Sequence, residues 1–152
     1  MMQSRRIDPL LRRAQEHEDE VARDLAERQR VLDTHLSRLD ELRRYAEEYA
    51  GAQMAATSPA QLMNRRAFLD RLDSAVAQQN QTVKNNREKV EAERARLILA
   101  SRDKQVLEQL AASYRAQEKV VTDRRDQREM DDIGARRSRL AQREDSENGG
   151  TP

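Results

Sequence analysis

Few residues in this chain are of types that act in catalysis, metal binding or phosphate binding. The sequence contains two histidines, His17 and His35, four glycines and no cysteine. Neither histidine has a glutamate three residues before it, so the Glu-x-x-His pattern of metal sites in helical bundles is missing. The glycines stand at positions 51, 134, 149 and 150 and form no phosphate-binding loop. We therefore expect no catalytic residue, no metal site and no bound cofactor.

Arginines gather near both ends of the chain. The distal group is interrupted by acidic residues, and the whole chain has a net charge of only +1. Binding to nucleic acid through counterion release favours an uninterrupted basic stripe, so we expect no nucleic-acid partner. The arginines in question are Arg5, Arg6, Arg12 and Arg13, and then Arg124, Arg125, Arg128, Arg136, Arg137, Arg139 and Arg143.

Apolar residues recur in a heptad pattern from Ser58 to about Leu140. This stretch has no internal proline after Pro59 and no glycine before Gly134, which is typical of a coiled-coil helix. A helix of this length cannot bury its apolar stripe alone and needs a partner helix. Position a reads Leu62, Leu69, Val76, Val83, Val90 and Leu97, and position d includes Leu72, Ala100, Leu107, Tyr114 and Val121.

A first helix is predicted from Asp8-Pro9, where a capping carboxylate precedes a proline in the first turn, to about Ala50. Residues 51–58 form a link, and Ser58-Pro59 repeats the start signal. Two amphipathic helices on a short link fold back on each other. The first heptad reads Leu11, Glu18, Leu25, Leu32, Leu39 and Ala46 at a, and Ala14, Val21, Arg28, His35, Leu42 and Tyr49 at d.

The predicted fold is all-α, a long antiparallel two-helix coiled-coil hairpin whose second helix overhangs. We expect a flexible head over residues 1–7, helix 1 over about 8–50, the link over 51–58, helix 2 over about 59–142 and a disordered tail over 143–152. The overhang keeps a thin apolar stripe that includes Leu107, Leu110, Tyr114 and Val121.

Two registers fit the heptads. If the numbers of facing residues add up to roughly 108, Leu39 meets Leu69 and Leu32 meets Val76. If they add up to roughly 115, His35 faces Gln79, and this pairing of polar with polar groups avoids unpaired buried polar atoms. The sequence leaves both registers open.

Phe68, Leu72, Ala75 and Gln79 form a further cluster on the second helix, and Phe68 is the only phenylalanine in the chain. These residues occupy g and d positions. They either cover the seam of the hairpin or form a half-exposed apolar anchor for a partner protein.

Three blocks of sequence together resemble the FliJ family of flagellar type III export proteins, over residues 5 to about 140. The first is Tyr45-Ala-Glu-Glu-Tyr49 and the second combines Gln61-Leu-Met-Asn64, Phe68-Leu-x-x-Leu72 and Gln78-Gln79. The third runs from Arg124 to Asp132. Arg65 stands where the family often has an aromatic residue, and Ile133 stands where a bulky apolar residue such as Phe often follows the acidic pair.

The resemblance implies a non-catalytic coiled-coil stalk that promotes the assembly and activity of the hexameric flagellar export ATPase. It also implies contact with the cytoplasmic domain of the export gate and with export chaperones. The protein would be cytoplasmic, a monomer when free, and associated with the inner membrane at the flagellar base only through its partners. The implied gate-binding residues are Phe68, Leu72, Ala75 and Gln79, and the implied ATPase-ring contacts are Arg124, Arg125, Gln127, Arg128, Met130 and Asp131.

A generic coiled-coil scaffold, or a protein that binds nucleic acid weakly, is the alternative function. A scaffold would self-associate through the overhang, whereas a stalk would stay monomeric in dilute solution. Nucleic-acid binding would depend strongly on salt.

Overall fold

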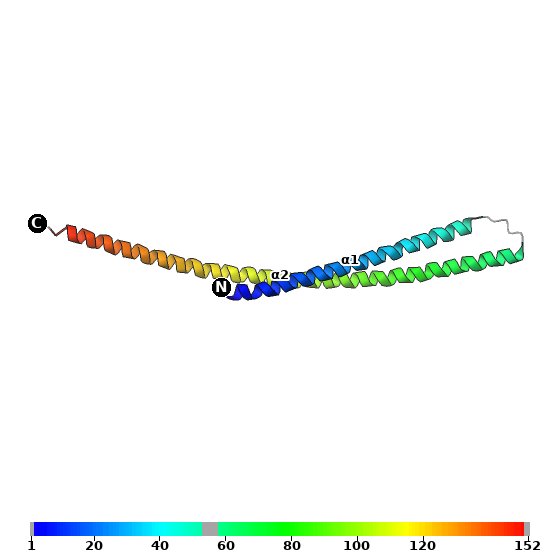
Figure 1. The fold of residues 1–152 in the computed structure, drawn as a ribbon, viewed down its shortest axis with the longest axis horizontal. Coiled ribbons are helices and arrows are strands. Elements are labelled where there is room, and N and C mark those ends of the chain that lie inside the picture. The colour runs from blue at the N-terminus through cyan, green and yellow to red at the C-terminus, as the bar shows by residue number, and fades with distance from the viewer. Residues whose placement is uncertain (1, 53–57, 151–152) are drawn as a thin grey trace. The chain divides into compact units, whose positions relative to one another are not determined.

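The computed structural model describes residues 2–52 and 58–150, and side chains from Gln3 onward within these ranges. This part of the chain contains two helices, α1 (Met2–Gly51) and α2 (Pro59–Asn148), and no strand. Long segments of α1 and α2 lie side by side and run in opposite directions (Figure 1). The prediction of an all-α helical hairpin is confirmed.

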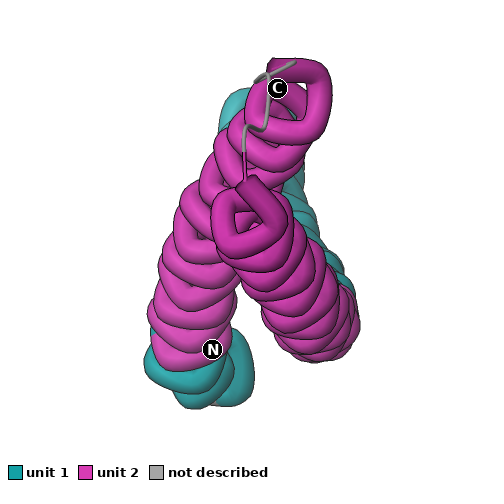
Figure 2. Tube along the Cα trace, turned by 90° about the vertical axis from the view of Figure 1, so that its right-hand side faces the viewer, with its two compact units in different colours: residues 1–12, 105–152 teal, residues 13–104 magenta. Residues whose placement is uncertain are grey.

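The helices divide into two compact units, coloured in Figure 2. Unit 1 comprises Met1–Arg12 and Gln105–Pro152, and unit 2 comprises Arg13–Lys104. Each unit therefore contains a segment of α1 and a segment of α2.

The core of unit 2 follows the predicted heptads. Apolar residues at a and d positions of one helix lose water by packing on the other, which supplies most of the stability of an amphipathic helix. Among the predicted seam positions that the structure describes in unit 2, only Arg28 and Leu62 are exposed. The buried apolar residues of unit 2 are Val21, Leu39, Leu72, Val83, Val90 and Ala100.

Polar contacts across the seam fix the register of unit 2. The Gln79 side-chain amide donates a hydrogen bond to the His35 carbonyl oxygen (2.9 Å) and lies 3.3 Å from His35 Nδ1. This is the pairing expected in the second register. Towards the other end of unit 2, Lys104 Nζ donates to Glu18 Oε1 at 3.1 Å, a pair whose numbers add up to 122. The two sums differ because long side chains reach along the helix as well as across it, so both pairs fit one hairpin. Neither pair could form in the first register, in which facing residue numbers add up to roughly 108.

The ends of the helices at the link are capped. Ala52 N donates to Glu48 O at 2.9 Å, and Gln61 N donates to Ser58 Oγ at 3.2 Å. The second contact is the N-cap that Ser58-Pro59 predicts. Most of the predicted link, residues 53–57, lies outside the described residues.

In unit 1, α1 begins at Met2, before the expected start at Asp8, and Pro9 lies inside the helix. Residues 2–7 are thus helical, where a flexible head over residues 1–7 was expected. Ser4 and Ile7 are buried in this segment, as is Ala111 on α2. These contacts with α2 hold the first turns in place, although Pro9 removes one backbone hydrogen bond.

The far segment of α2 is also longer than predicted, since the helix continues to Asn148 instead of ending near residue 142. Residues 143–148 are helical because the stretch before and through them is rich in Ala, Arg, Gln and Glu, which favour helices. Every residue from Lys119 to Gly150 is exposed. Within unit 1, no part of α1 lies beside this segment (Figure 1), and it is called the overhang below.

Candidate partner-binding surfaces

The six predicted ATPase-ring residues all lie on the overhang and are exposed. Arg124, Gln127, Arg128 and Asp131 follow the i, i+3, i+4, i+7 spacing that places side chains on one face of a helix. The Met130 side chain keeps 68% of its surface in water. A flexible, exposed methionine is available for contact with a partner.

Side chains of the overhang pair with each other along the helix. Arg125 Nε lies 3.5 Å from Glu129 Oε1, and the Gln127 amide donates to Asp131 Oδ1 at 3.3 Å. The side chains of Arg125 and Glu129 are 79% and 64% exposed. Exposed pairs of this type contribute roughly 0 to 1 kcal/mol, so a partner can replace them at little cost.

The four predicted gate-binding residues lie in unit 2, against α1. Leu72 is buried, whereas Phe68, Ala75 and Gln79 are half-buried. The Phe68 ring packs between two tyrosines of α1, with ring centroids 4.5 Å from Tyr49 and 6.3 Å from Tyr45. Of the two alternatives for this cluster, the structure shows the seam-covering contacts directly.

These contacts limit what remains for a partner. The Gln79 amide is occupied by His35, and Leu72 has almost no accessible surface. The accessible parts of Phe68 and Ala75 are what a partner could touch while the hairpin stays closed.

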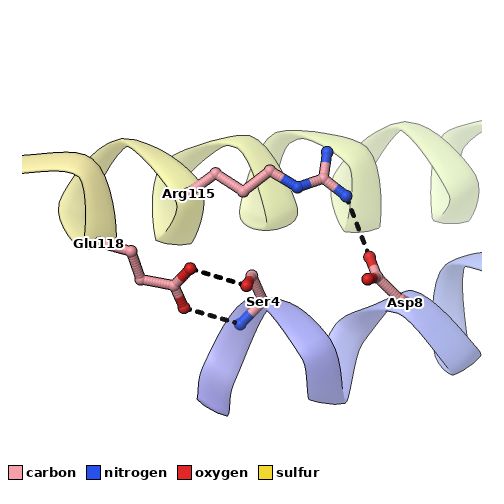
Figure 3. A network of polar contacts seen from close by, with 4 residues as sticks. All are labelled: Ser4, Asp8, Arg115 and Glu118. Carbon is pink, nitrogen blue, oxygen red and sulfur yellow. Dashed lines mark hydrogen bonds and ion pairs between the residues drawn. The ribbon is translucent and has the colours of Figure 1, made fainter. Parts of the chain in front are cut away.

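A polar clasp in unit 1 joins the first turns of α1 to α2 (Figure 3). The two carboxylate oxygens of Glu118 accept hydrogen bonds from Ser4, one from its backbone N–H (3.2 Å) and one from its hydroxyl (2.7 Å). Arg115 Nη2 donates to Asp8 Oδ1 at 3.0 Å. Glu118 thus supplies to α1, from another helix, the acceptor that an N-cap residue normally supplies.

Two glutamates at these seam contacts have altered acidity. Hydrogen bonds from Ser4 lower the pKa of Glu118 below its ordinary value of 4.5. The hydrogen bond from Lys104, followed by one from Ser101, lowers the pKa of Glu18 below the same value. In both cases the charged carboxylate is favoured because its hydrogen bonds are made in the folded state.

The two shifts predict a loss of stability in acid. A carboxyl group whose pKa is lower in the folded state stabilises the fold above its unfolded pKa, and this stabilisation disappears as the pH falls through the folded pKa. We expect the melting temperature to be flat near neutral pH and to fall below about pH 4.5. Replacing Glu18 and Glu118 by glutamine should flatten that fall.

Thermal melts followed by circular dichroism, at intervals from about pH 3 to about pH 7, measure this effect. Glu20→Gln, at an exposed site near Glu18, is the matched control and should keep the wild-type profile. If the variant with both glutamines lost as much melting temperature in acid as wild type does, Glu18 and Glu118 would not be the cause of the loss.

Sequence reasoning did not find the Ser4–Glu118 clasp, because residues 1–7 were expected to be loose. The signal was present in the heptad itself. Lys104 and Glu118 occupy a positions where apolar residues are the rule, and Glu18 does so on the first helix. A charged residue at an a position calls for a polar partner on the facing helix, which the structure supplies.

No group of three or more His, Cys, Asp or Glu side chains that could hold a metal ion occurs within residues 2–52 and 58–150. Neither α1 nor α2, over its described length, has a stretch apolar enough to cross a membrane.

Comparison with known proteins gives one family. The family model described as Flagellar FliJ protein matches residues 2–143 of the 152-residue chain. Neither the curated proteins nor the solved structures contain a match. The match covers both helices through the clasp and most of the overhang, and it confirms the resemblance seen in the sequence. The chain therefore belongs to the FliJ family, a family of non-catalytic components of flagellar export.

Proposed function

We propose that this protein is the coiled-coil stalk of the flagellar type III export apparatus, and that it promotes the assembly and activity of the hexameric export ATPase. Membership of the FliJ family supports a role in flagellar export. The observation that carries the finer proposal is the overhang, a helical segment exposed at every position from Lys119 to Gly150 and rich in charge of both signs.

The overhang has the properties that a shaft inside a ring needs. It presents Arg124, Arg125, Gln127, Arg128, Met130 and Asp131 without burying any of them against the rest of the chain. Weak, exposed charge contacts can be made and broken as the ring cycles, whereas a tight contact would stall it. The clasp holds the start of α1 against α2 at Glu118, so the overhang begins next to a segment that is paired with α1.

We propose that the protein works in the cytoplasm, as a monomer at low concentration, and reaches the inner membrane at the flagellar base only through its partners. Its partners would be the ATPase ring, the cytoplasmic domain of the export gate and export chaperones. A direct test of the first partner is size-exclusion chromatography with light scattering of the same organism's export ATPase, with and without this protein. More hexamer in its presence supports the proposal, and an unchanged size distribution contradicts it.

The gate contact is proposed at Phe68, Leu72, Ala75 and Gln79. Since Leu72 is buried and Gln79 is bonded to His35, the closed hairpin offers mainly Phe68 and Ala75 to the gate. A large apolar side chain that stays partly accessible can act as an anchor for a partner protein.

We predict that Phe68→Ala combined with Leu72→Ala weakens binding to the cytoplasmic domain of the gate by at least about tenfold. Because both residues also pack on α1, a control that loosens the same seam from the other side is needed. Leu25→Ala combined with Leu32→Ala removes half-buried α1 side chains from the same seam and leaves Phe68 and the two tyrosines that contact it in place.

Isothermal titration calorimetry, together with far-UV circular dichroism, measures affinity and helix content for both variants. The account expects loss of affinity only in the Phe68 and Leu72 variant. Equal losses of affinity in the two variants would show that loosening the hairpin causes the effect, and would contradict a gate-binding surface at Phe68 and Leu72.

A further inference from the structure

We propose that α2 pairs with α2 of a second copy of this chain over residues 106–120, in antiparallel orientation, with the two-fold axis level with Arg115. The inference stands apart from the ATPase proposal. It rests on a second stripe of uncharged side chains on α2, on a shallow groove along that stripe, and on the match between the stripe and its own reversed copy.

In unit 1, α2 carries an outer stripe besides the heptad that packs on α1. Members of the outer stripe follow each other at alternating spacings of four and three residues, which keeps side chains on one face of a coiled-coil helix. This face lies roughly a quarter turn round α2 from Ala111 and Tyr114, which hold a and d positions of the hairpin seam. The outer stripe consists of Val106, Leu110, Ser113, Gln117 and Val120.

The outer stripe is exposed and carries no charge. Its apolar members, Val106, Leu110 and Val120, keep 62%, 39% and 49% of their surface in water, and its two polar members are exposed as well. Gln109 and Ala116, which border the stripe, are also uncharged. Charged residues make up 38% of the chain, and they normally occupy the solvated face of a helix. A face without charge over about four turns therefore indicates a surface that a partner covers.

A shallow groove of about 430 Å³ follows the distal half of this stripe. Every residue that lines it belongs to α2, so a second helix can enter the groove without displacing α1. No charged side chain lines the groove. Its lining consists of Ser113, Ala116, Gln117, Val120 and Val121.

The order of residues along the outer stripe matches that of a reversed copy. If the numbers of facing residues add up to roughly 230, Leu110 of one copy faces Val120 of the other, and Ser113 faces Gln117. Apolar side chains then meet apolar ones and polar side chains meet polar ones, so no polar group is covered without a polar neighbour. The two-fold symmetry repeats both contacts.

The nearest charges are compatible with the same pairing, which favours a second copy as the occupant. Val106 faces Arg124, whose long apolar stem covers the valine while the guanidinium stays in water. Asp123 lies level with Gln109 of the other copy, and the small side chain of Ala116 lies level with its own equivalent. On the contacting faces of residues 106–124, no two like charges therefore lie opposite each other.

The outer stripe ends where the proposed ring-contact residues begin, and Arg124 belongs to both surfaces. The second copy and the ATPase ring would therefore compete for this end of the stripe. The expected pair is weak, because it uses one face of one helix over about four turns. The chain would be monomeric when dilute and paired when concentrated.

Sedimentation equilibrium of the full chain, over a concentration series up to about 0.5 mM, tests the pairing in a range suited to weak association. Wild type should dimerise, and its association constant should not fall at roughly 0.5 M NaCl, because the contacts are apolar and salt screens only charges. A chain that stays monomeric over the whole range overturns the proposal and leaves the stripe to a helix of another protein. A fall of about tenfold or more at high salt would also overturn it, since charges elsewhere would then hold the pair.

Two charge substitutions test the antiparallel register. Leu110→Glu and Val120→Lys each set a charge against an apolar side chain, and each alone should weaken association at least about tenfold. The variant that carries both places a new carboxylate opposite a new ammonium group twice, so it should associate at least about threefold more tightly than either single variant. A parallel pair would set like charges opposite each other and show no recovery. Undiminished dimerisation of a single variant, or no recovery in the combined one, contradicts the arrangement.

Ile133→Glu is the matched control for these variants. It makes the same kind of change at an apolar residue that is 47% exposed, but on a different face of α2. Its association constant should equal that of wild type, and far-UV circular dichroism should show equal helix content in all four variants. If Ile133→Glu weakened the pair as much as Leu110→Glu does, the loss would come from added charge in general, and the outer stripe would not be the contact.

Disulfide formation locates the facing residues directly, since the chain has no cysteine of its own. Ser113→Cys and Gln117→Cys each introduce one thiol at positions that face each other only between two antiparallel copies. Mild oxidation of an equimolar mixture should give clearly more mixed disulfide, by mass spectrometry, than the half that random pairing would give. A random distribution, or an excess of disulfides between identical variants, would overturn the proposed register.

Discussion

Reversing the charge of Arg124, Arg125 and Arg128 to glutamate is expected to reduce stimulation of the export ATPase at least about tenfold at a fixed, subsaturating concentration of this protein. Three charge contacts of roughly 0.5 to 1 kcal/mol each amount to about 2 kcal/mol, and about 1.4 kcal/mol already corresponds to a tenfold change in affinity. The three side chains are exposed, so their replacement should leave the hairpin folded.

The matched control for this variant reverses three exposed arginines of unit 2, Arg66, Arg71 and Arg87, to glutamate. It makes the same change in net charge at sites away from the overhang. Steady-state ATP hydrolysis at several protein concentrations compares the two variants with wild type. Equal losses in both would indicate a general charge effect, and full stimulation by the Arg124, Arg125 and Arg128 variant would remove the proposed ring surface.

Leu39→Ala is expected to have the largest effect on stability of any single substitution considered for this chain. Leu39 is only 6% exposed, and truncating a buried leucine costs about 2 to 5 kcal/mol through lost burial and the cavity that remains. A two-helix hairpin has no second layer to take up the loss. We therefore expect the melting temperature to fall by roughly 5 to 20 °C.

Leu99→Ala is the control, because it makes the same chemical change on α2 at a site that is 58% exposed. Its melting temperature should stay close to that of wild type, since surface substitutions usually change stability by less than about 0.5 kcal/mol. Thermal melts of both variants at equal concentration measure the difference. Similar melting temperatures for the two would show that Leu39 does not lie in the core of the hairpin.

The sequence predicted the fold because its strongest signal is periodic. A heptad that continues for many turns determines which face of each helix is buried, and the buried residues Val21, Leu39, Val83 and Val90 all lie at predicted seam positions. Ser58-Pro59 predicted the start of α2 for an equally local reason, since a hydroxyl cap and a proline act within one helical turn.

The extent of the helices and the details of the seam could not be read in the same way, because they depend on contacts between distant residues. Ser4 and Glu118 are far apart in the sequence, and no local pattern around either residue predicts its contact with the other. Their contact nevertheless extends α1 to Met2, where local signals had placed the start at Asp8. The register was open for the same reason until His35 was found bonded to Gln79.

The two candidate surfaces also differ in how much of them the sequence predicts. The exposure of the ring-contact residues follows from the weakening of the heptad from Lys104 onward, where charged residues occupy a positions. The environment of Phe68 does not, because a g position can be covered or free depending on the facing helix. In this chain Tyr45 and Tyr49 cover much of it, and only the fold reveals how much remains for a partner.

The most direct test of the stalk proposal is the steady-state rate of ATP hydrolysis by the same organism's export ATPase, titrated with this protein while the size of the ring is followed. The stalk account predicts a saturable rise in rate that accompanies an increase in hexamer. A rate and a ring size that stay unchanged across the titration would contradict it.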